Sequence, residues 1–265
     1  MDFAGKVAVI TGAGNGIGRQ TALAFAGRGA KVLVVDKDTD AADRTAGTIR
    51  QQGGEARPRA ADVTKSADVQ GYVAAALDAW GRIDCFFNNA GIEGKVCPVA
   101  EYDEAVFDQV MSVNVKGVFL GLRHVLPVML KQKAGAVVNT ASVAGLVASP
   151  GMSAYVASKH AVLGLTKAAA GEVARSGVRV NAVCPGPIDT RMIHAIESQI
   201  DPANPGGVST RYQSALPIGR YGTPEEVANV VLFLCSDLAG NVTGAQYVVD
   251  GGRTATGGAI TAQRS

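Results

Sequence analysis

Strand-like and helix-like segments alternate along nearly the whole of this 265-residue chain. The strand-like segments are short runs rich in Val, Ile and Ala, and residues 30–35 are almost continuously apolar, as strands buried on both faces are. We expect strands at residues 6–10, 30–35, 56–61, 83–87, 135–140, 178–183 and 246–249. We expect helices at residues 16–29, 38–52, 66–80, 101–131, 153–175 and 224–236. Such alternation requires crossover connections, which favour a parallel sheet.

The fold class that this order predicts is α/β, a doubly wound Rossmann fold. Seven parallel strands would carry helices on both faces, within a single domain spanning residues 1–265. Pro58 agrees with this arrangement, because proline cannot donate to a sheet ladder and therefore favours an edge strand. The strand order 3-2-1-4-5-6 places the third strand at such an edge.

Two segments depart from the alternation. Residues 185–221 are rich in Gly and Pro. We expect an irregular lid there, since long loops in compact domains are usually functional. Residues 254–265 are small and polar, and we expect a surface tail.

Composition excludes several partners. The chain has 25 Lys and Arg against 23 Asp and Glu, a net charge of +2, which predicts neither a nucleic-acid nor an anionic-membrane partner. No apolar run approaches the roughly 18 residues of a membrane helix, and the first residues lack signal-peptide features. The four cysteines form no C-x-x-C pair, and no Cys/His cluster has metal-ligand spacing. We expect buried thiols, no metal, and a cytoplasmic location.

A glycine-rich turn, Thr11–Gly18, joins the first expected strand to the first helix. Glycines let the backbone turn tightly and approach a pyrophosphate, while the helix start supplies free N–H groups and a partial positive charge. We therefore expect a dinucleotide cofactor here. The residues expected to bind it are Gly12, Asn15, Gly16, Ile17 and Gly18.

Asp36 ends the second expected strand, 18 residues after Gly18. A carboxylate at this interval accepts hydrogen bonds from the adenosine ribose hydroxyls and repels a 2′-phosphate, which favours NAD(H) over NADP(H). Lys37 is the counter-evidence, because a cation beside the ribose could accept a phosphate. Asn15 stands where a basic residue would have argued for NADP(H).

Tyr155 and Lys159 lie four residues apart on an expected helix and so share one face. A tyrosine has an ordinary pKa of about 10, and a nearby ammonium favours its phenolate. Ser142 follows an expected strand at the carboxyl edge, where doubly wound folds bind ligands. We expect Tyr155 as acid/base, with Ser142 holding the substrate oxygen.

Taken together, these motifs resemble the short-chain dehydrogenase/reductase family, in its single-domain branch. They span residues 6–252 in the family's order. The matching pieces are Thr11–Gly18, Asp62-Val63, Asn88-Asn89-Ala90-Gly91, Asn114, Ser142, Tyr155-Val156-Ala157-Ser158-Lys159 and Pro185-Gly186. Tyr155, Lys159, Ser142 and Asn114 match the family's catalytic set.

The resemblance implies a role for each matching position. Lys159 would lower the pKa of Tyr155 and bind the nicotinamide ribose, and Asn114 would bend its helix and hold a water linking Lys159 to solvent. Asp62 and Val63 would flank the adenine. Further cofactor contacts are implied for Asn88, Asn89, Ala90, Gly91, Pro185, Gly186, Ile188 and Thr190. The family's usual homotetramer would use the helices at 101–131 and 153–175 in one interface, and the last helix and strand in the other. Because residues 254–265 follow that interface strand, we hypothesise that this tail reaches a neighbouring subunit's site.

The expected activity is NAD(H)-dependent interconversion of a secondary, possibly cyclic, alcohol and its ketone. The expected pocket wall is mostly apolar: Val143, Leu146, Met152 and Met192, with Ser142 and Tyr155 as its polar members. Glu93 is a further candidate beside the substrate. An acyl-thioester ketoreductase is the nearest alternative, although the family version usually prefers NADP(H). An enoyl reductase would place its lysine farther from the tyrosine, an epimerase would need a larger C-terminal region, and a non-catalytic dinucleotide sensor could dispense with Tyr155 and Lys159.

Overall fold

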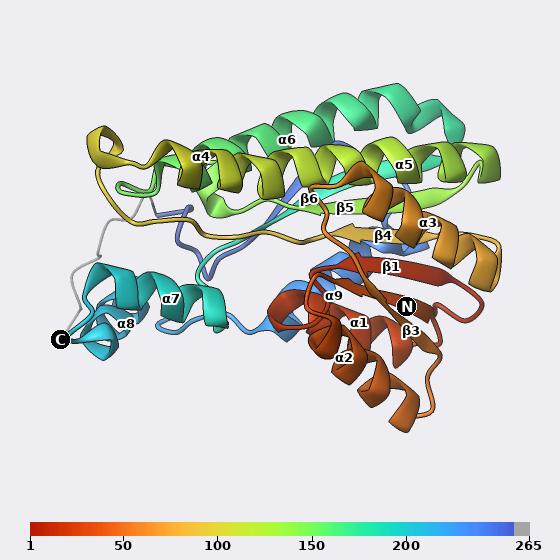
Figure 1. The fold of residues 1–265 in the computed structure, drawn as a ribbon, viewed down its shortest axis with the longest axis horizontal. Coiled ribbons are helices and arrows are strands. Elements are labelled where there is room, and N and C mark those ends of the chain that lie inside the picture. The colour runs from red at the N-terminus through yellow and green to blue at the C-terminus, as the bar shows by residue number, and fades with distance from the viewer. Residues whose placement is uncertain (257–265) are drawn as a thin grey trace.

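A seven-stranded parallel sheet forms the centre of the molecule (Figure 1). The structure, a computed structural model, describes residues 1–256. The strands are β1 (Val7–Thr11), β2 (Lys31–Asp36), β3 (Ala56–Ala60), β4 (Cys85–Asn88), β5 (Gly135–Thr140), β6 (Val178–Pro185) and β7 (Gln246–Val249). Their order, β3-β2-β1-β4-β5-β6-β7, confirms the predicted topology. Pro58 lies on the edge strand β3, opposite Val34.

Helices cover both faces of the sheet (Figure 1). One face carries α1 (Gly16–Ala26), α2 (Thr39–Gln51) and α9 (Pro224–Cys235); the other carries α3 (Ser66–Trp80), α4 (Glu104–Met111), α5 (Gly117–Gln132) and α6 (Ser153–Val173). Successive residues of a strand pack against opposite helical layers. Ala8 and Ile10 pack toward α1 and α9, whereas Val9 joins the core under α3 and α5. Short 3-10 turns lie at Val99–Glu101, Val143–Gly145, Ala174–Ser176 and Asp237–Ala239.

The helix expected at residues 101–131 is interrupted. Asp103 caps the start of α4, because its side chain accepts a hydrogen bond from the Val106 N–H at 3.1 Å. A π-helical turn, Ser112–Lys116, then separates α4 from α5. Such turns are rare and occur frequently at functional sites.

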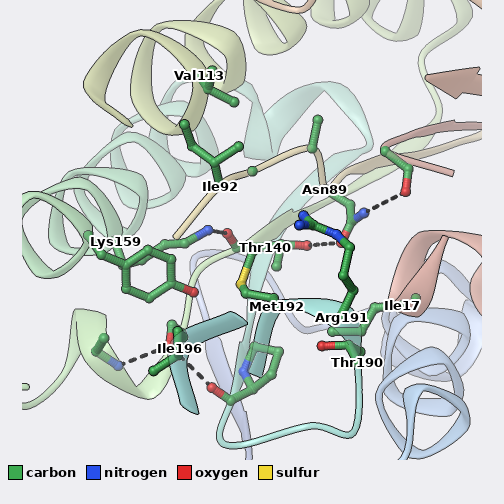
Figure 2. A pocket seen from close by; sticks show the side chains of 18 of the residues that line it. Ile17, Asn89, Ile92, Val113, Thr140, Lys159, Thr190, Arg191, Met192 and Ile196 are labelled. Carbon is green, nitrogen blue, oxygen red and sulfur yellow. Dashed lines mark hydrogen bonds between the residues drawn. The ribbon is translucent and has the colours of Figure 1, made fainter. Parts of the chain in front are cut away.

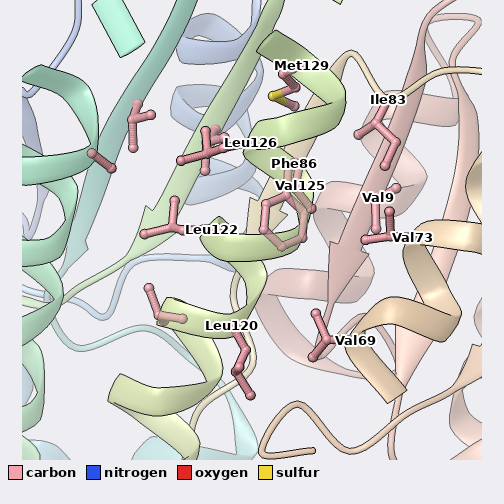
Figure 3. Close-up of a cluster of buried hydrophobic side chains, with 14 of the residues drawn as sticks. Val9, Val69, Val73, Ile83, Phe86, Leu120, Leu122, Val125, Leu126 and Met129 are labelled. Carbon is pink, nitrogen blue, oxygen red and sulfur yellow. The ribbon is translucent and has the colours of Figure 1, made fainter. Parts of the chain in front are cut away.

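The segment Glu104–Gln132 is long and apolar enough to cross a membrane by length and hydropathy alone, which the expectation from apolar runs missed. Half of its most apolar window is buried within the protein. Leu122, Val125 and Met129 pack toward Phe86 of the sheet (Figure 3). The segment therefore acts as a core helix of the fold.

The segment expected to be an irregular lid contains two helices, so that part of the prediction is wrong. These are α7 (Arg191–Ile200) and α8 (Pro205–Ser214), and they lie together beyond one end of the sheet (Figure 1). Asn204 starts α8 by accepting a hydrogen bond from the Gly207 N–H at 3.0 Å. Residues 254–256 form a turn, and the rest of the expected tail lies outside the described residues.

Candidate functional site

The glycine-rich turn opens a groove along the carboxyl edge of the sheet, with a cavity volume of about 1070 Å³. Gly12 and Gly16 have φ of +64° and +52°, a region that side chains other than glycine rarely adopt. A Cβ on Gly18 would lie 2.1 Å from the Gly12 carbonyl oxygen, so only glycine allows α1 to pack this closely. Asn15, Gly16 and Ile17 line the groove at the start of α1. These features fit a diphosphate.

The Asp36 carboxylate is held in place at the end of β2. Its Oδ2 accepts a hydrogen bond from the Gly14 N–H at 2.9 Å, and its Oδ1 accepts one from the Asp38 N–H at 3.0 Å. Asp36 and Lys37 both line the groove. The carboxylate keeps lone pairs for ribose hydroxyls, because each oxygen has more than one acceptor site. This geometry fits NAD(H).

Asp62 and Val63 line the same groove beyond Asp36. Burial alone would raise the pKa of Asp62, but hydrogen bonds from the Thr64 N–H and hydroxyl outweigh it and lower that pKa. Val63 fits here because residue 117 is glycine: a Cβ there would lie 2.9 Å from the Val63 Cγ2. No local pattern around Gly117 indicates this role.

Asn89, Ala90 and Gly91 line the groove, but Asn88 does not. Asn88 points into the core, where its Nδ2 donates to the Val118 carbonyl at 2.9 Å and to Asn139 Oδ1 at 3.2 Å. Its expected cofactor contact is therefore wrong, because the alternation of β4 turns it away from the cleft.

Asn89 ties two strand ends together at the groove. Its Nδ2 donates to the Thr11 carbonyl at 3.0 Å. Its Oδ1 accepts from the Thr140 hydroxyl at 3.1 Å (Figure 2). These two bonds use both ends of the amide. The backbone of Ala90 and Gly91 is thereby fixed beside the glycine-rich turn Thr11–Gly18, from here on called the phosphate turn.

Ser142, Tyr155 and Lys159 come together in the groove. Lys159 is 3% exposed and donates from Nζ to the Thr140 carbonyl at 2.8 Å (Figure 2). Its Nζ lies 5.4 Å from the centre of the Tyr155 ring. The Ser142 hydroxyl donates to the Pro185 carbonyl at 3.3 Å and accepts from the Ala144 N–H at 3.1 Å.

Burial dominates the electrostatics of this cluster. It raises the pKa of Tyr155 to about 12, with Glu93 adding to the rise and the Ser142 hydroxyl opposing it. It also lowers the pKa of Lys159 to about 8. Lys159 is not among the groups that shift the pKa of Tyr155. The expected lowering of that pKa by Lys159, helped by a cationic nicotinamide, stays a prediction.

Asn114 occupies the π-helical turn and is fully buried. Its Oδ1 accepts from the Ile92 N–H at 2.9 Å, while its Nδ2 donates to the Ile92 carbonyl at 2.9 Å and to the Ser158 hydroxyl at 3.0 Å. A Cβ on Gly91 would lie 3.2 Å from the Asn114 Oδ1 and 3.5 Å from the Lys159 Nζ. Asn114 thus links the loop after β4 to α6, beside Lys159.

The far wall of the groove comes from the segment after β6. Pro185, Gly186, Ile188 and Thr190 line it as expected, and a parallel bridge between Ile188 and Gly222 fixes its base. The apolar residues Val143, Met152, Met192, Ile193 and Ile196 also face the groove. Leu146 does not, because it packs against the hydrophobic core.

Several groove contacts join residues too distant in sequence for any motif to predict. The Gln199 side chain on α7 accepts from the Val96 N–H at 2.9 Å and donates to the Gly94 carbonyl at 3.2 Å. Arg191 pairs with Glu93 across the groove.

His194 makes further contacts that no sequence motif predicts. It bridges Asp189 and Glu197, each at 2.9 Å, and Glu197 accepts from the Tyr221 hydroxyl at 2.6 Å. The hydrogen bond with Glu197 is the largest influence on His194 and raises its pKa. Within residues 1–256, no group of three or more His, Cys, Asp or Glu side chains is placed to hold a metal ion.

Comparisons with known proteins agree with this architecture. The family described as enoyl-(acyl carrier protein) reductase matches residues 12–254. Levodione reductase of Leifsonia aquatica is 43% identical over 96% of each chain, and cyclohexanol dehydrogenase of an Acinetobacter species is 44% identical over 95% of this chain and 96% of the relative.

Solved structures extend the likeness to three dimensions. The crystal structure of levodione reductase gives a TM-score of 0.94 and covers 96% of this chain and 99% of its own. NAD+-bound xylitol dehydrogenase, 36% identical, gives 0.90 and covers 95% of this chain and 100% of its own. On these grounds, the chain belongs to the short-chain dehydrogenase/reductase family of NAD(P)-dependent oxidoreductases.

Proposed function

We propose that this protein oxidises a small secondary or cyclic alcohol with NAD and reduces the corresponding ketone with NADH. The observation that carries the proposal is the meeting of Tyr155, Ser142 and Lys159 where the dinucleotide groove reaches an apolar wall. Relatives named levodione reductase and cyclohexanol dehydrogenase support a cyclic substrate. Asp36 supports NAD over NADP and weighs against an acyl-thioester ketoreductase.

Tyr155 is the proposed acid/base. In oxidation its phenolate oxygen takes the proton of the substrate hydroxyl, and in reduction its hydroxyl returns that proton to the carbonyl oxygen. The Ser142 hydroxyl lies beside Tyr155 and holds the same substrate oxygen by a hydrogen bond. NAD, when bound, supplies the carbon that accepts the hydride.

Lys159 supports this role as a positive charge 5.4 Å from the Tyr155 ring centre. A buried tyrosine with a pKa of about 12 needs help to act as a base near neutral pH. Lys159 is the proposed source of part of that help, together with the charge of the oxidised nicotinamide. Asn114 is a proposed positioning residue, because its amide binds Ile92 and Ser158, the residue that precedes Lys159.

The substrate pocket is the space between Val143 and Met152 on one side and α7 on the other. Met192, Ile193 and Ile196 supply its α7 wall. Apolar walls bury ring or alkyl carbons, while Tyr155 and Ser142 fix the oxygen. Residues 185–221 act in this proposal as a lid on one domain that spans residues 1–265.

We further propose a homotetramer in the cytoplasm. Phe107 and Phe119, on the expected helical interface, are 38% and 45% exposed, and Val248 on β7 is 42% exposed. Exposed apolar side chains of this kind are typical of interfaces. All four cysteines are free, which suits a reducing compartment. Light scattering of the purified protein at about 10 μM tests the assembly, and a monomeric mass contradicts it.

The activity is tested by following NADH formation at 340 nm with a panel of secondary and cyclic alcohols. NAD and NADP are compared at equal concentrations. We expect turnover with NAD and much less with NADP. Turnover with NADP alone contradicts the role given to Asp36 and favours the acyl-thioester alternative. Absence of turnover despite NADH binding contradicts the proposed reaction.

A further inference from the structure

The first residue of α7, Arg191, lies across the cofactor groove. Figure 2 shows its side chain extending from the Thr190 end of the lid toward Asn89 on the opposite wall. Thr190 itself lies at the phosphate turn, because a Cβ on Gly16 would be 3.4 Å from the Thr190 Cγ2. The helix that carries Arg191 therefore begins against the turn that fits the diphosphate.

Arg191 holds its present partner loosely. Its Nη1 lies 3.8 Å from Glu93 Oε1, on the loop after β4. The Arg191 side chain is 75% exposed, whereas the Glu93 side chain is 12% exposed. No other acidic side chain within residues 1–256 lies within 4 Å of the guanidinium. An ion pair with one partner so exposed is weak, so the guanidinium can change partner at little cost.

Among the positively charged side chains that line the groove, Arg191 is the one placed near its middle. The charged side chains that line it are Asp36, Lys37, Asp38, Asp62, Asp108, Lys159, Arg191 and Arg253. Lys37 lies beside Asp36 at the adenosine end, and Lys159 is buried at the other end on the Thr140 carbonyl. Arg253 lies in the turn of residues 251–256, where Gly251 packs against Ile218 and Gly252 against Pro217.

A dinucleotide carries two negative charges on its diphosphate. At the phosphate turn they meet backbone N–H groups and the positive end of α1, which attract anions. A guanidinium adds charge-assisted hydrogen bonds in a planar fork that matches phosphate oxygens. Arg191 is the lid residue placed to supply them, one residue beyond Thr190.

We propose that Arg191 is a diphosphate-binding residue for NAD(H) and that Glu93 competes with the diphosphate for its guanidinium. Binding of the cofactor exchanges one partner of Arg191 for the other and draws the start of α7 onto the cofactor. The proposal concerns cofactor binding alone. It stands whether or not the substrate class proposed above is correct.

The test is equilibrium binding, which needs no turnover. NADH and ADP-ribose are titrated into wild type and Arg191→Met by calorimetry, at low and high salt. We expect the Kd for both ligands to rise by the same factor, roughly 5- to 20-fold for a largely exposed charged contact. Arg191→Lys keeps a positive charge and should raise both Kd values by a smaller factor. Arg211→Met, an exposed arginine on α8 outside the groove, is the matched control and leaves both Kd values unchanged.

A second variant tests the competition. Glu93→Gln is expected to tighten NADH binding by about 2- to 5-fold, the range of an exposed ion pair, and to have no effect when combined with Arg191→Met. An unchanged Kd in Arg191→Met overturns the proposal. A loss for NADH but not for ADP-ribose also overturns it, because the guanidinium would then act on the nicotinamide end. Weaker NADH binding in Glu93→Gln overturns the competition, since Glu93 would then hold Arg191 in place.

Discussion

The two walls of the groove are built in different ways. The wall formed by β1, β2, β4 and β5 is fixed by buried and part-buried hydrogen bonds, among them Lys159 to Thr140 and Asn89 to Thr11. The wall formed by α7 meets the loop after β4 through exposed hydrogen bonds, those of Gln199 with Gly94 and Val96. Breaking a buried hydrogen bond leaves polar groups without a partner, which costs much free energy, so its geometry is kept. The groups of an exposed hydrogen bond can bind water instead. We expect the first wall to determine the chemistry and the second to determine which substrate enters.

The largest expected effect separates the chemistry from binding. Tyr155→Phe removes the proposed acid/base and lowers turnover by at least about 10²- to 10⁴-fold, the range of general acid–base catalysis. The Kd for NADH should remain within about 2-fold, because the phenyl ring keeps the packing. Tyr102→Phe, outside the groove, is the matched control. Activity retained in Tyr155→Phe would contradict the role of this wall.

Lys159→Met tests how much the burial of the Lys159 ammonium in the first wall costs in folding stability. Burial lowers the pKa of Lys159 from its ordinary 10.5 to about 8. The folded state therefore holds this proton less tightly than the unfolded state, and the resulting penalty, about 3 kcal/mol at most, is complete below pH 8. It fades as pH rises from about 8 to 10.5.

The stability difference between Lys159→Met and wild type should follow this penalty. Denaturant unfolding at several pH values measures it. We expect the difference to shift toward wild type by up to that amount between pH 8 and 10.5. A difference that is constant with pH would show that Lys159 is not destabilised by burial. Lys167→Met, on the same helix, is the control.

Asp36→Ala is expected to have a smaller effect, confined to the cofactor. Loss of the ribose acceptor should raise the Kd for NADH about 10- to 100-fold, since hydrogen bonds to a charged group are worth roughly 1.5–3 kcal/mol. The Kd for NADPH should change less, because repulsion of the 2′-phosphate is removed at the same time. Fluorescence titration of both cofactors measures the ratio. Asp40→Ala is the control, and an unchanged ratio would contradict the role of Asp36.

Gln199→Ala tests the α7 wall and has the smallest expected effect. Two partly exposed hydrogen bonds to the loop after β4 are lost, so the KM for the alcohol should rise about 3- to 10-fold. The Kd for NADH should stay within about 2-fold. Ser198→Ala, on the same helix, is the control. A fall in kcat with an unchanged KM would show that the two walls do not divide the work as described.

The sequence predicted the two walls unequally for a physical reason. The strand order, the phosphate turn and the Tyr155–Lys159 spacing follow from local patterns, in which neighbouring residues carry the whole signal. The frequent Gly and Pro of residues 185–221 predict an irregular loop in place of α7 and α8, although Asn204 before Pro205 is a helix-start signal.

Tertiary contacts account for the other differences. Asn88 shares a motif with Asn89 but faces the core, and the pKa of Tyr155 depends on burial that no spacing reveals. Glu93 and Arg191 lie 98 positions apart, and their pairing arises only when the two walls meet. Local sequence patterns therefore do not predict features that depend on contacts between distant segments.

The proposed reaction is direct hydride transfer from an alcohol carbon to NAD, with Tyr155 as the acid/base. The measurement uses the best alcohol of the panel, deuterated at its carbinol carbon, with unlabelled NAD. Mass spectrometry then reads the reduced cofactor. We expect NADH heavier by one deuterium with the wild type, and almost none of it with Tyr155→Phe. Unlabelled NADH, or equal labelling by Tyr155→Phe, would contradict it.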